Sequence, residues 1–349
     1  MMRASSRAIR QGQRPALHAD GLAHDAISFE KKPDYIETPS HNAIVARALA
    51  YLQAGFAVHF TGCSGVGKTA LAMHLAASVG RPAVFVQGDH QLDGSDLIGK
   101  QQGCLSTTVV DNYVHSVMKK EERTTSDWSD NPLATACRYG YTFIYDEFSR
   151  SRPETNNVLL PVLGERLLIL PGNLSGERYI QVHPEFNAIF TSNPQDYAGV
   201  HKTQDALRDR MITIRLDHYD EITETRITHA KSQLTMPEAA LVVSLIRQCR
   251  ALQADKVRPT IRACMVLGKM LSRLGSEELA PDSCSFSNQL KQICTDILGS
   301  EGSTGSESHE VPAAQVAALI DDFVQDFLLL SSTRAMNTED ISTVPEVQW

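Results

Sequence analysis

Residues 60–76 read FTGCSGVGKTALAMHLA, and this stretch decides the fold class. It fits the pattern G-x-x-x-x-G-K-[ST], with Gly62, Gly67, Lys68 and Thr69 at the fixed positions. The apolar residues 57–61 before it predict a short strand. The four-residue apolar step in residues 69–79 after it predicts a helix. A glycine-rich loop between a strand and a helix is the setting in which this pattern binds a nucleotide phosphate.

The chemistry of this loop defines the first set of candidate site residues. Glycine permits the backbone dihedrals that let successive N–H groups surround a phosphate, and the helix N-terminus adds partial positive charge. We expect Lys68 to neutralise the β- and γ-phosphates and Thr69 to ligate Mg²⁺. Cys63 is interpreted as a small filler residue rather than a redox gate. The predicted phosphate-binding residues are Gly62, Cys63, Ser64, Gly65, Val66, Gly67, Lys68 and Thr69.

Composition excludes several classes of protein. The chain has 349 residues, 42% of them hydrophobic, and a formal net charge of −8, which argues against general nucleic-acid binding. Seven scattered cysteines without a CxxC pair predict free thiols in a reducing compartment rather than disulfides or a zinc site. The basic N-terminus lacks the apolar segment of a signal peptide, and no stretch is long and apolar enough to span a membrane. These features predict a cytoplasmic protein.

The order of apolar segments predicts an α/β fold followed by a helical domain. Strands are expected at residues 57–61, 83–87, 141–145, 188–191 and 211–216, with helical patterns between them, such as 42–54 and 155–164. Continuous apolar strands that alternate with helices indicate a parallel sheet covered on both faces. After Asp220 only helices are expected, at residues 221–233, 238–253, 260–274 and 287–298.

The predicted domains follow from this pattern. A basic leader without regular structure is expected at residues 1–32, a nucleotide-binding domain at 33–218 and a helical domain at 219–298. A Gly/Ser linker (299–310), an amphipathic helix (311–330) and a tail (331–349) complete the chain. The last helix is equally compatible with docking on its own domain or on another protein.

Polar residues follow two of the predicted strands. Asp146 and Glu147 end an apolar strand, at the carboxyl edge where parallel sheets collect ligands. Asp146 is expected to hold Mg²⁺ through water, and Glu147 to orient the attacking water. Asn193 follows the next strand and is the natural polar reader of the γ-phosphate, with Ser192 and Thr191 as competitors for this role.

Phosphoryl transfer also benefits from an arginine, which can contribute about 10³–10⁵ in rate. Arg208 and Arg210 precede the last strand, and Arg262 begins a helix of the second domain. Chemistry alone does not choose among these residues and Arg150 or Arg152.

Taken in order, these motifs resemble those of AAA+ ATPases. The run DEFSRSRPETNNVLLPVLGERLLILPG is similar to the MoxR branch, where this segment carries a helix and a hairpin before the sensor strand. GDHQLDGSDLIGKQQG, residues 88–103, also resembles that branch's insertion in the second helix. In contrast with many relatives, the loop opens Gly62-Cys63-Ser64-Gly65, and Gly164 stands where a glutamate is common, which leaves Glu165 to supply the charge.

Longer segments resemble the gas vesicle protein N family over about residues 34–298. They include RPAVFVQGDHQLDGSDLIG, LATACRYGYTFIYDEFSRSRPETNNVLLPVLGERLLILP and FTSNPQDYAGVHKTQDALRDRMITI. The resemblance implies a P-loop AAA+ ATPase domain with a C-terminal helical lid, ATP and Mg²⁺ as ligands, and a homo-hexameric ring. It implies Lys68 and Thr69 for ATP and Mg²⁺, and Asp146 and Glu147 for hydrolysis. It also implies Asn193 as sensor, Arg210 as a finger acting on the neighbouring subunit, and Arg262 as the lid sensor.

Three functional hypotheses remain open at this point. The first is an ATP-driven assembly factor for gas vesicles that acts on shell or accessory proteins, cytoplasmic or associated with the vesicles. The second is a MoxR-type chaperone that activates a metalloenzyme or a carboxylase. The third is a nucleotide switch without turnover, against which the intact Asp146–Glu147 pair speaks.

Overall fold

The computed structural model describes residues 35–111, 119–171, 177–193, 205–252, 259–274, 283–300 and 313–339. The predicted leader (1–32) lies outside these ranges, as do residues 301–310 of the predicted linker and residues 340–349 of the predicted tail. Among the helices within them, none combines the length and the apolar character that a membrane span requires.

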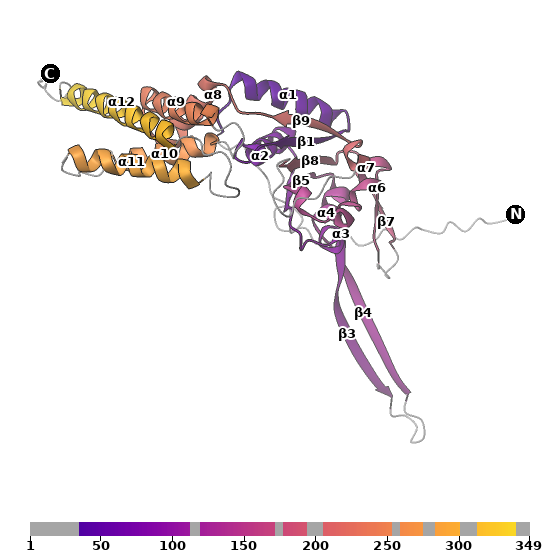
Figure 1. Ribbon diagram of the computed structural model, residues 1–349. Coiled ribbons are helices and arrows are strands. Elements are labelled where there is room, and N and C mark those ends of the chain that lie inside the picture. The colour runs from indigo at the N-terminus through magenta and orange to yellow at the C-terminus, as the bar shows by residue number, and fades with distance from the viewer. Residues whose placement is uncertain are drawn as a thin grey trace, which may run out of the picture.

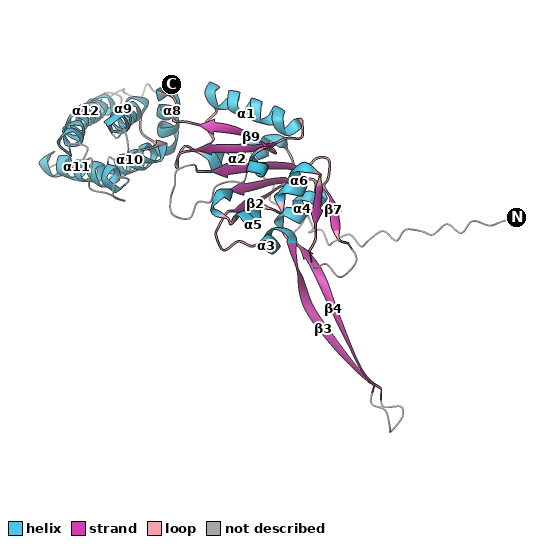
Figure 2. Cartoon of the chain, turned by 45° about the vertical axis from the view of Figure 1, so that its right-hand side comes forward, coloured by secondary structure: helices cyan, strands magenta, loops and turns pink. Residues whose placement is uncertain are grey.

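A sheet of five parallel strands forms the centre of the molecule (Figure 2). Its strand order is β2-β5-β8-β1-β9. All five lie where the sequence predicts strands. Because the strands are parallel, the carboxyl ends of β1, β5 and β8 lie at one edge. The strands are β1 (Ala57–Gly62), β2 (Ala83–Gln87), β5 (Thr142–Asp146), β8 (Asn187–Ser192) and β9 (Met211–Leu216).

Apolar side chains alternate between two cores along these strands. In β5, Phe143 and Tyr145 join one core, while Ile144 joins the other. In β8, Phe190 and Ile189 divide in the same way. The first core also contains side chains of α3 (Gly94–Ile98), α4 (Pro132–Tyr139) and α6 (Leu159–Gly164). The second contains those of α1 (Pro39–Gln53) and α2 (Lys68–Val79). Both faces are therefore covered, which accounts for the continuously apolar strands.

The helical part forms a third core of its own beside the sheet (Figure 1). It consists of α8 (Glu221–Ser232), α9 (Met236–Leu252), α10 (Ile261–Leu274), α11 (Ser283–Ser300) and α12 (Ala313–Glu339). On α12, Ile320, Phe323, Val324 and Phe327 are buried in this core. The amphipathic helix thus packs on the chain's own helices.

Two hairpins leave the sheet region. The strands β3 (Gly99–Asp111) and β4 (Lys119–Asp130) pair antiparallel and project far from the body (Figure 1). The sequence did not predict these strands, because they lack the apolar alternation that marks a half-buried strand. The shorter pair, β6 (Leu167–Ile169) and β7 (Tyr179–Gln181), is the expected hairpin before the sensor strand. Short helices α5 (Pro153–Asn156), η1 (Phe148–Arg150) and α7 (Asp205–Arg208) complete the described elements.

Two predicted helices were wrong in their extent. The helix expected over residues 155–164 is divided into α5 and α6, because Pro161 lacks the N–H that would donate to Asn157 in a continuous helix. Instead the Leu160 N–H donates to the Asn157 carbonyl at 3.1 Å. The last helix continues past residue 330 to Glu339, since no glycine or proline follows to stop it before that point.

Candidate nucleotide site

The loop of residues 62–69, called here the phosphate loop, connects β1 to α2. Gly65 and Gly67 have φ of +80° and +84°, the left-handed region that glycine adopts without strain. A Cβ at Gly65 would also lie 2.3 Å from Thr260 Oγ1, in the helical part of the chain. Position 65 therefore requires glycine for two reasons: the left-handed backbone conformation and the close approach of Thr260.

Lys68 folds back over this loop. Its Nζ donates to the carbonyl oxygens of Gly62 at 2.8 Å and Cys63 at 2.6 Å, and the residue is only 8% exposed. Burial lowers the pKa of Lys68 below its ordinary value, and nearby Cys63 and the carboxylates of Glu147 and Asp146 offset this only in part. The ammonium is thus held at the loop by carbonyls, in position to neutralise a phosphate.

The carboxylate of Asp146, at the end of β5, accepts hydrogen bonds from two hydroxyl groups. Thr69 Oγ1 lies 2.8 and 2.9 Å from its two carboxylate oxygens, and Thr191 Oγ1 donates to Asp146 Oδ1 at 2.6 Å. Hydroxyl and carboxylate oxygens are the hard ligands that Mg²⁺ prefers, so the pair of Thr69 and Asp146 fits the predicted metal site. The cation would supply charge neutralisation between the phosphates when bound.

Glu147 adopts an unusual backbone conformation. Its φ of +51° and ψ of +37° place a non-glycine residue in the left-handed region, at a cost of about 1–3 kcal/mol. Its N–H donates to Thr191 Oγ1 at 2.9 Å, which helps to fix this conformation. Its Oε2 lies 2.9 Å from Arg150 Nη1 in an ion pair. Glu147 thus sits in a fixed turn directly after Asp146, beside the phosphate loop, where a residue that aligns water is expected.

The strand β8 ends beside this carboxylate pair. Its Ser192 Oγ lies 2.8 Å from Nε2 of the buried His59, whose Nδ1 lies 3.0 Å from Thr213 Oγ1. Burial, together with the nearby charge of Arg208, lowers the pKa of His59 to about 4. Asn193 is the first residue beyond the strand and is half-buried. Thr191 and Ser192 hold the strand in place, and the position of Asn193 past the sheet edge suits a phosphate reader.

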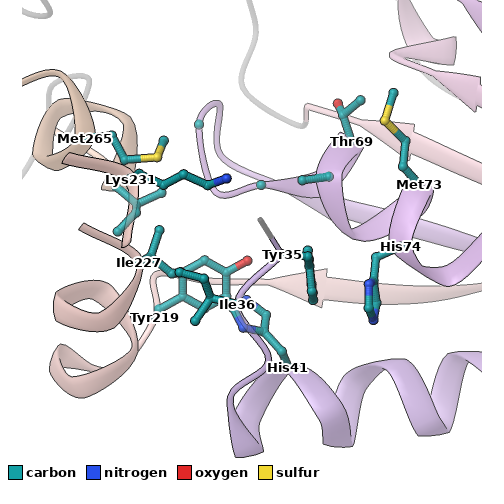
Figure 3. A pocket seen from close by; sticks show the side chains of 14 residues that line it. Tyr35, Ile36, His41, Thr69, Met73, His74, Tyr219, Ile227, Lys231 and Met265 are labelled. Atoms are coloured by element: carbon teal, nitrogen blue, oxygen red, sulfur yellow. The ribbon is translucent and has the colours of Figure 1, made fainter. Parts of the chain in front are cut away.

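A pocket of about 440 Å³ adjoins the phosphate loop (Figure 3). Aromatic rings meet here: Tyr35 and His74 stack at 3.8 Å between centroids, and His41 packs edge-on against Tyr219 at 4.4 Å. Figure 3 shows Lys231 extending into the space from α8. The remaining lining residues are Ile36, Gly65, Gly67, Thr69, Ala70, Met73, Ile227, Ile261 and Met265. A largely apolar pocket beside a phosphate loop suits a nucleobase.

The helical part reaches the phosphate loop through two segments. The Tyr219 hydroxyl donates to the Val66 carbonyl at 2.7 Å, and burial raises the pKa of Tyr219 to about 12. Thr260 lies against Gly65, and its Oγ1 accepts from the Arg262 N–H at 3.4 Å. The exposed Arg262 is close enough to lower the pKa of Lys68. The structure thus brings the predicted lid arginine to the loop.

Arg210 lies at the opposite end of the sheet. It precedes β9, whose first residue, Met211, pairs with Ala57 at the start of β1, far from the phosphate loop at the end of β1. Its Nη1 donates to the Ala206 carbonyl at 2.8 Å, and its Nη2 lies 3.9 Å from Glu165 Oε1. A Cβ at Gly164 would come within 2.8 Å of Arg210 Nε, so glycine at this position makes room for the guanidinium.

The structure therefore gathers the phosphate loop, Asp146, Glu147, Asn193 and Arg262 at one edge, and separates Arg210 from them. Sequence reasoning missed Tyr219, Thr260 and the aromatic cluster. These residues can be recognised as part of the site only in the folded structure, because contacts such as that between Tyr219 and Val66 join residues 153 positions apart. A tyrosine three residues after an apolar strand carries no signal of its own.

Comparisons with known proteins agree with this geometry. A family model described as an AAA domain of the dynein-related subfamily matches residues 57–211. Gas vesicle ATPase GvpN of Ancylobacter aquaticus is 40% identical over 302 residues, covering 86% of this chain and 83% of that protein. Gas vesicle ATPase GvpN of Haloferax mediterranei is 39% identical over 283 residues, covering 81% and 78%. Protein NorQ of Paracoccus denitrificans is 28% identical over 207 residues, covering 59% and 69%.

Proposed function

The chain belongs to the GvpN family of AAA+ ATPases, and we propose that it uses ATP hydrolysis to promote the formation and growth of gas vesicles. In this proposal it acts on vesicle shell or accessory proteins, works as a homo-hexameric ring, and is cytoplasmic or associated with the vesicles. The observation that carries the proposal is the extent of its likeness to proteins named gas vesicle ATPase, which spans most of both chains.

The proposed residue roles are supported by the geometry of the site. The phosphate-loop amides and Lys68 bind the phosphates of ATP, with the base in the pocket beside Tyr219. Thr69 and Asp146 hold Mg²⁺, and their 2.8 Å hydrogen bond supports this assignment. Glu147 accepts a proton from the attacking water and aligns it. Asn193 contacts the γ-phosphate at the sheet edge.

Two arginines complete the site from different directions. Arg262 contacts the phosphates from the chain's own helical part, which is supported by its bond to Thr260, the residue that lies against Gly65. Arg210 acts on the nucleotide of the neighbouring subunit, which is supported by its position at the far end of β9. A ring in which each site needs its neighbour would transmit the state of one nucleotide to the next subunit.

A deletion strain tests the cellular role. Strains that carry no gene for this chain, the intact gene, or the Glu147→Gln variant are compared by electron microscopy of vesicle number and width. We expect few or narrow vesicles in the deletion and variant strains, and full restoration by the intact gene. Full-width vesicles at normal abundance in the deletion strain would contradict the proposal. Normal vesicles with Glu147→Gln alone would support the nucleotide switch.

The chaperone alternative has weaker support. The likeness to NorQ is lower and covers less of both chains than the likeness to the GvpN proteins. A pull-down from vesicle-forming cells separates the two, since a chaperone role predicts an oxidoreductase or carboxylase as the captured protein, and the assembly role predicts shell or accessory proteins.

A further inference from the structure

A buried carboxylate in the helical part holds two arginines. The Glu224 side chain on α8 is only 1% exposed. Its Oε2 accepts from Arg247 Nη1 at 3.0 Å, and its Oε1 accepts from Arg250 Nη2 at 2.9 Å, both from α9. Burying a carboxylate is unfavourable unless it is fully paired, and a buried ion pair often stabilises a fold no more than apolar residues would. Joining two helices therefore does not by itself explain why a glutamate is buried here.

Arg247 connects Glu224 to the phosphate loop through hydrogen bonds. Arg247 Nη1 also lies 3.2 Å from the carbonyl oxygen of Tyr219, to which it donates. The Tyr219 hydroxyl in turn donates to the Val66 carbonyl at 2.7 Å, inside the phosphate loop. One oxygen of Glu224 therefore fixes, through Arg247, the backbone of the residue that holds Val66.

Arg250 connects Glu224 to the same loop through a second segment of the chain. Arg250 is buried, and its Nε donates to the carbonyl oxygen of Pro259 at 2.8 Å. The next residue, Thr260, lies against Gly65 and accepts from the backbone N–H of Arg262. The other oxygen of Glu224 therefore fixes the segment that presents Arg262 to the site.

We propose that Glu224 is a positioning residue of the nucleotide site, which aligns Tyr219 and Arg262 with the phosphate loop through Arg247 and Arg250. The inference rests on the proposed ATPase site. It assigns to this carboxylate the coupling between the helical part and the phosphate loop, although Glu224 does not line the pocket beside that loop. Loss of Glu224 then weakens ATP binding and turnover beyond any effect on stability.

Glu238 offers a matched control in the same helical part. It is also a buried carboxylate, 4% exposed, and its Oε2 accepts from the Thr235 N–H at 2.7 Å at the start of α9. This bond is local to the helix terminus, as is the bond from the Glu238 N–H to Thr235 Oγ1 at 3.5 Å. Glu238→Gln reports the effect of changing a buried carboxylate in these helices.

The test compares full-length wild type, Glu224→Gln and Glu238→Gln. Calorimetric titration with Mg–ATP gives Kd, steady-state assays give kcat and KM, and thermal unfolding without nucleotide gives Tm. Since coupled residues interact by amounts that correspond to about tenfold, we expect Kd to rise about tenfold in Glu224→Gln. We expect the Kd of Glu238→Gln to stay within about twofold of the wild-type Kd, although its Tm falls about as much as that of Glu224→Gln. Equal Kd values for Glu224→Gln and wild type would overturn the proposal.

A double-mutant cycle separates positioning from general damage. If Glu224 acts through Arg262, then Arg262→Ala raises Kd less in the Glu224→Gln background than in wild type. Equal effects in both backgrounds would overturn this step. If Glu224→Gln does not fold, Arg250→Lys serves in the same cycle, since lysine keeps the charge but cannot reach Glu224 and Pro259 as a fork.

The outcomes also distinguish this inference from the proposed function. ATP binding by wild type together with an unchanged Glu224→Gln variant refutes positioning and leaves the ATPase site intact. Absence of ATP binding by folded wild type refutes both.

Discussion

Replacement of Arg210 by alanine isolates the contact between neighbouring subunits. Within one chain, β9 runs from Met211 beside Ala57 to Leu216 beside Gly62, five steps of about 3.3 Å each, or about 17 Å. This span is longer than an arginine side chain, so Arg210 cannot reach the phosphate loop of its own subunit. A catalytic effect of Arg210→Ala must then be exerted on a neighbour's nucleotide.

The size of the effect follows from what Arg210 contacts. Among the described residues of its own subunit, it is partly exposed, donates a hydrogen bond to Ala206 and lies 3.9 Å from Glu165, so its loss changes stability by only about 0–1 kcal/mol. An arginine that stabilises the phosphoryl transition state contributes about 10³–10⁵ in rate, or roughly 4–7 kcal/mol. We expect Arg210→Ala to leave Tm and the Kd for ATP unchanged and to lower kcat by the same factor of about 10³–10⁵.

Mixing two inactive variants gives the decisive assay. Arg210→Ala subunits retain Glu147, and Glu147→Gln subunits retain Arg210. In randomly mixed rings at equal amounts, about one quarter of the interfaces combine an intact Glu147 with an intact neighbouring Arg210. ATP turnover should rise to about a quarter of the wild-type rate after subunit exchange. A mixture no more active than the separate variants, measured after exchange is demonstrated with tagged subunits, would refute the reasoning.

Three further predictions concern the site and its supports. Glu147→Gln should keep the Kd for Mg–ATP and lose hydrolysis, because the amide cannot accept the proton of water; turnover above a few per cent of wild type would contradict this. Gly65→Ala should raise Kd at least about tenfold, since a left-handed alanine costs about 1–2 kcal/mol and its Cβ would meet Thr260 Oγ1 at 2.3 Å; Gly80→Ala, also left-handed but without neighbours within 4 Å, is the control and should keep Kd. Burial holds the pKa of His59 at about 4, below its ordinary 6.5, so its contribution to stability is present above pH 6.5 and is lost as the pH falls toward 4. This difference amounts to about 3 kcal/mol, and His59→Gln should flatten that part of the pH profile in denaturant unfolding, whereas an unchanged slope would exclude His59 as its source.

Much of the sheet domain could be predicted from local patterns. The five central strands are buried on both faces, and continuous apolar runs such as residues 211–216 therefore reveal them. The phosphate loop and Asp146 were found because each follows such a strand directly. The carboxyl ends of parallel strands must meet, and the 2.8 Å contact between Thr69 and Asp146 confirms that these two predicted residues lie together.

Other parts depend on contacts that no local pattern encodes. The projecting strands β3 and β4 have no core to face, so the apolar alternation that identifies strands is missing from them. Thr260 reaches Gly65 only after the helical part has folded against the sheet. Glu224 reads as an ordinary surface glutamate at a helix start, and only the three-dimensional structure shows that two arginines bury it.

Titration of the full-length protein with Mg–ATP by calorimetry tests the central claim most directly, with the Lys68→Ala variant measured beside it. The account predicts that well-folded wild type binds one ATP per chain and that Lys68→Ala, with unchanged Tm, gives no binding heat. Absence of ATP uptake by wild type, or equal uptake by both proteins, would contradict it.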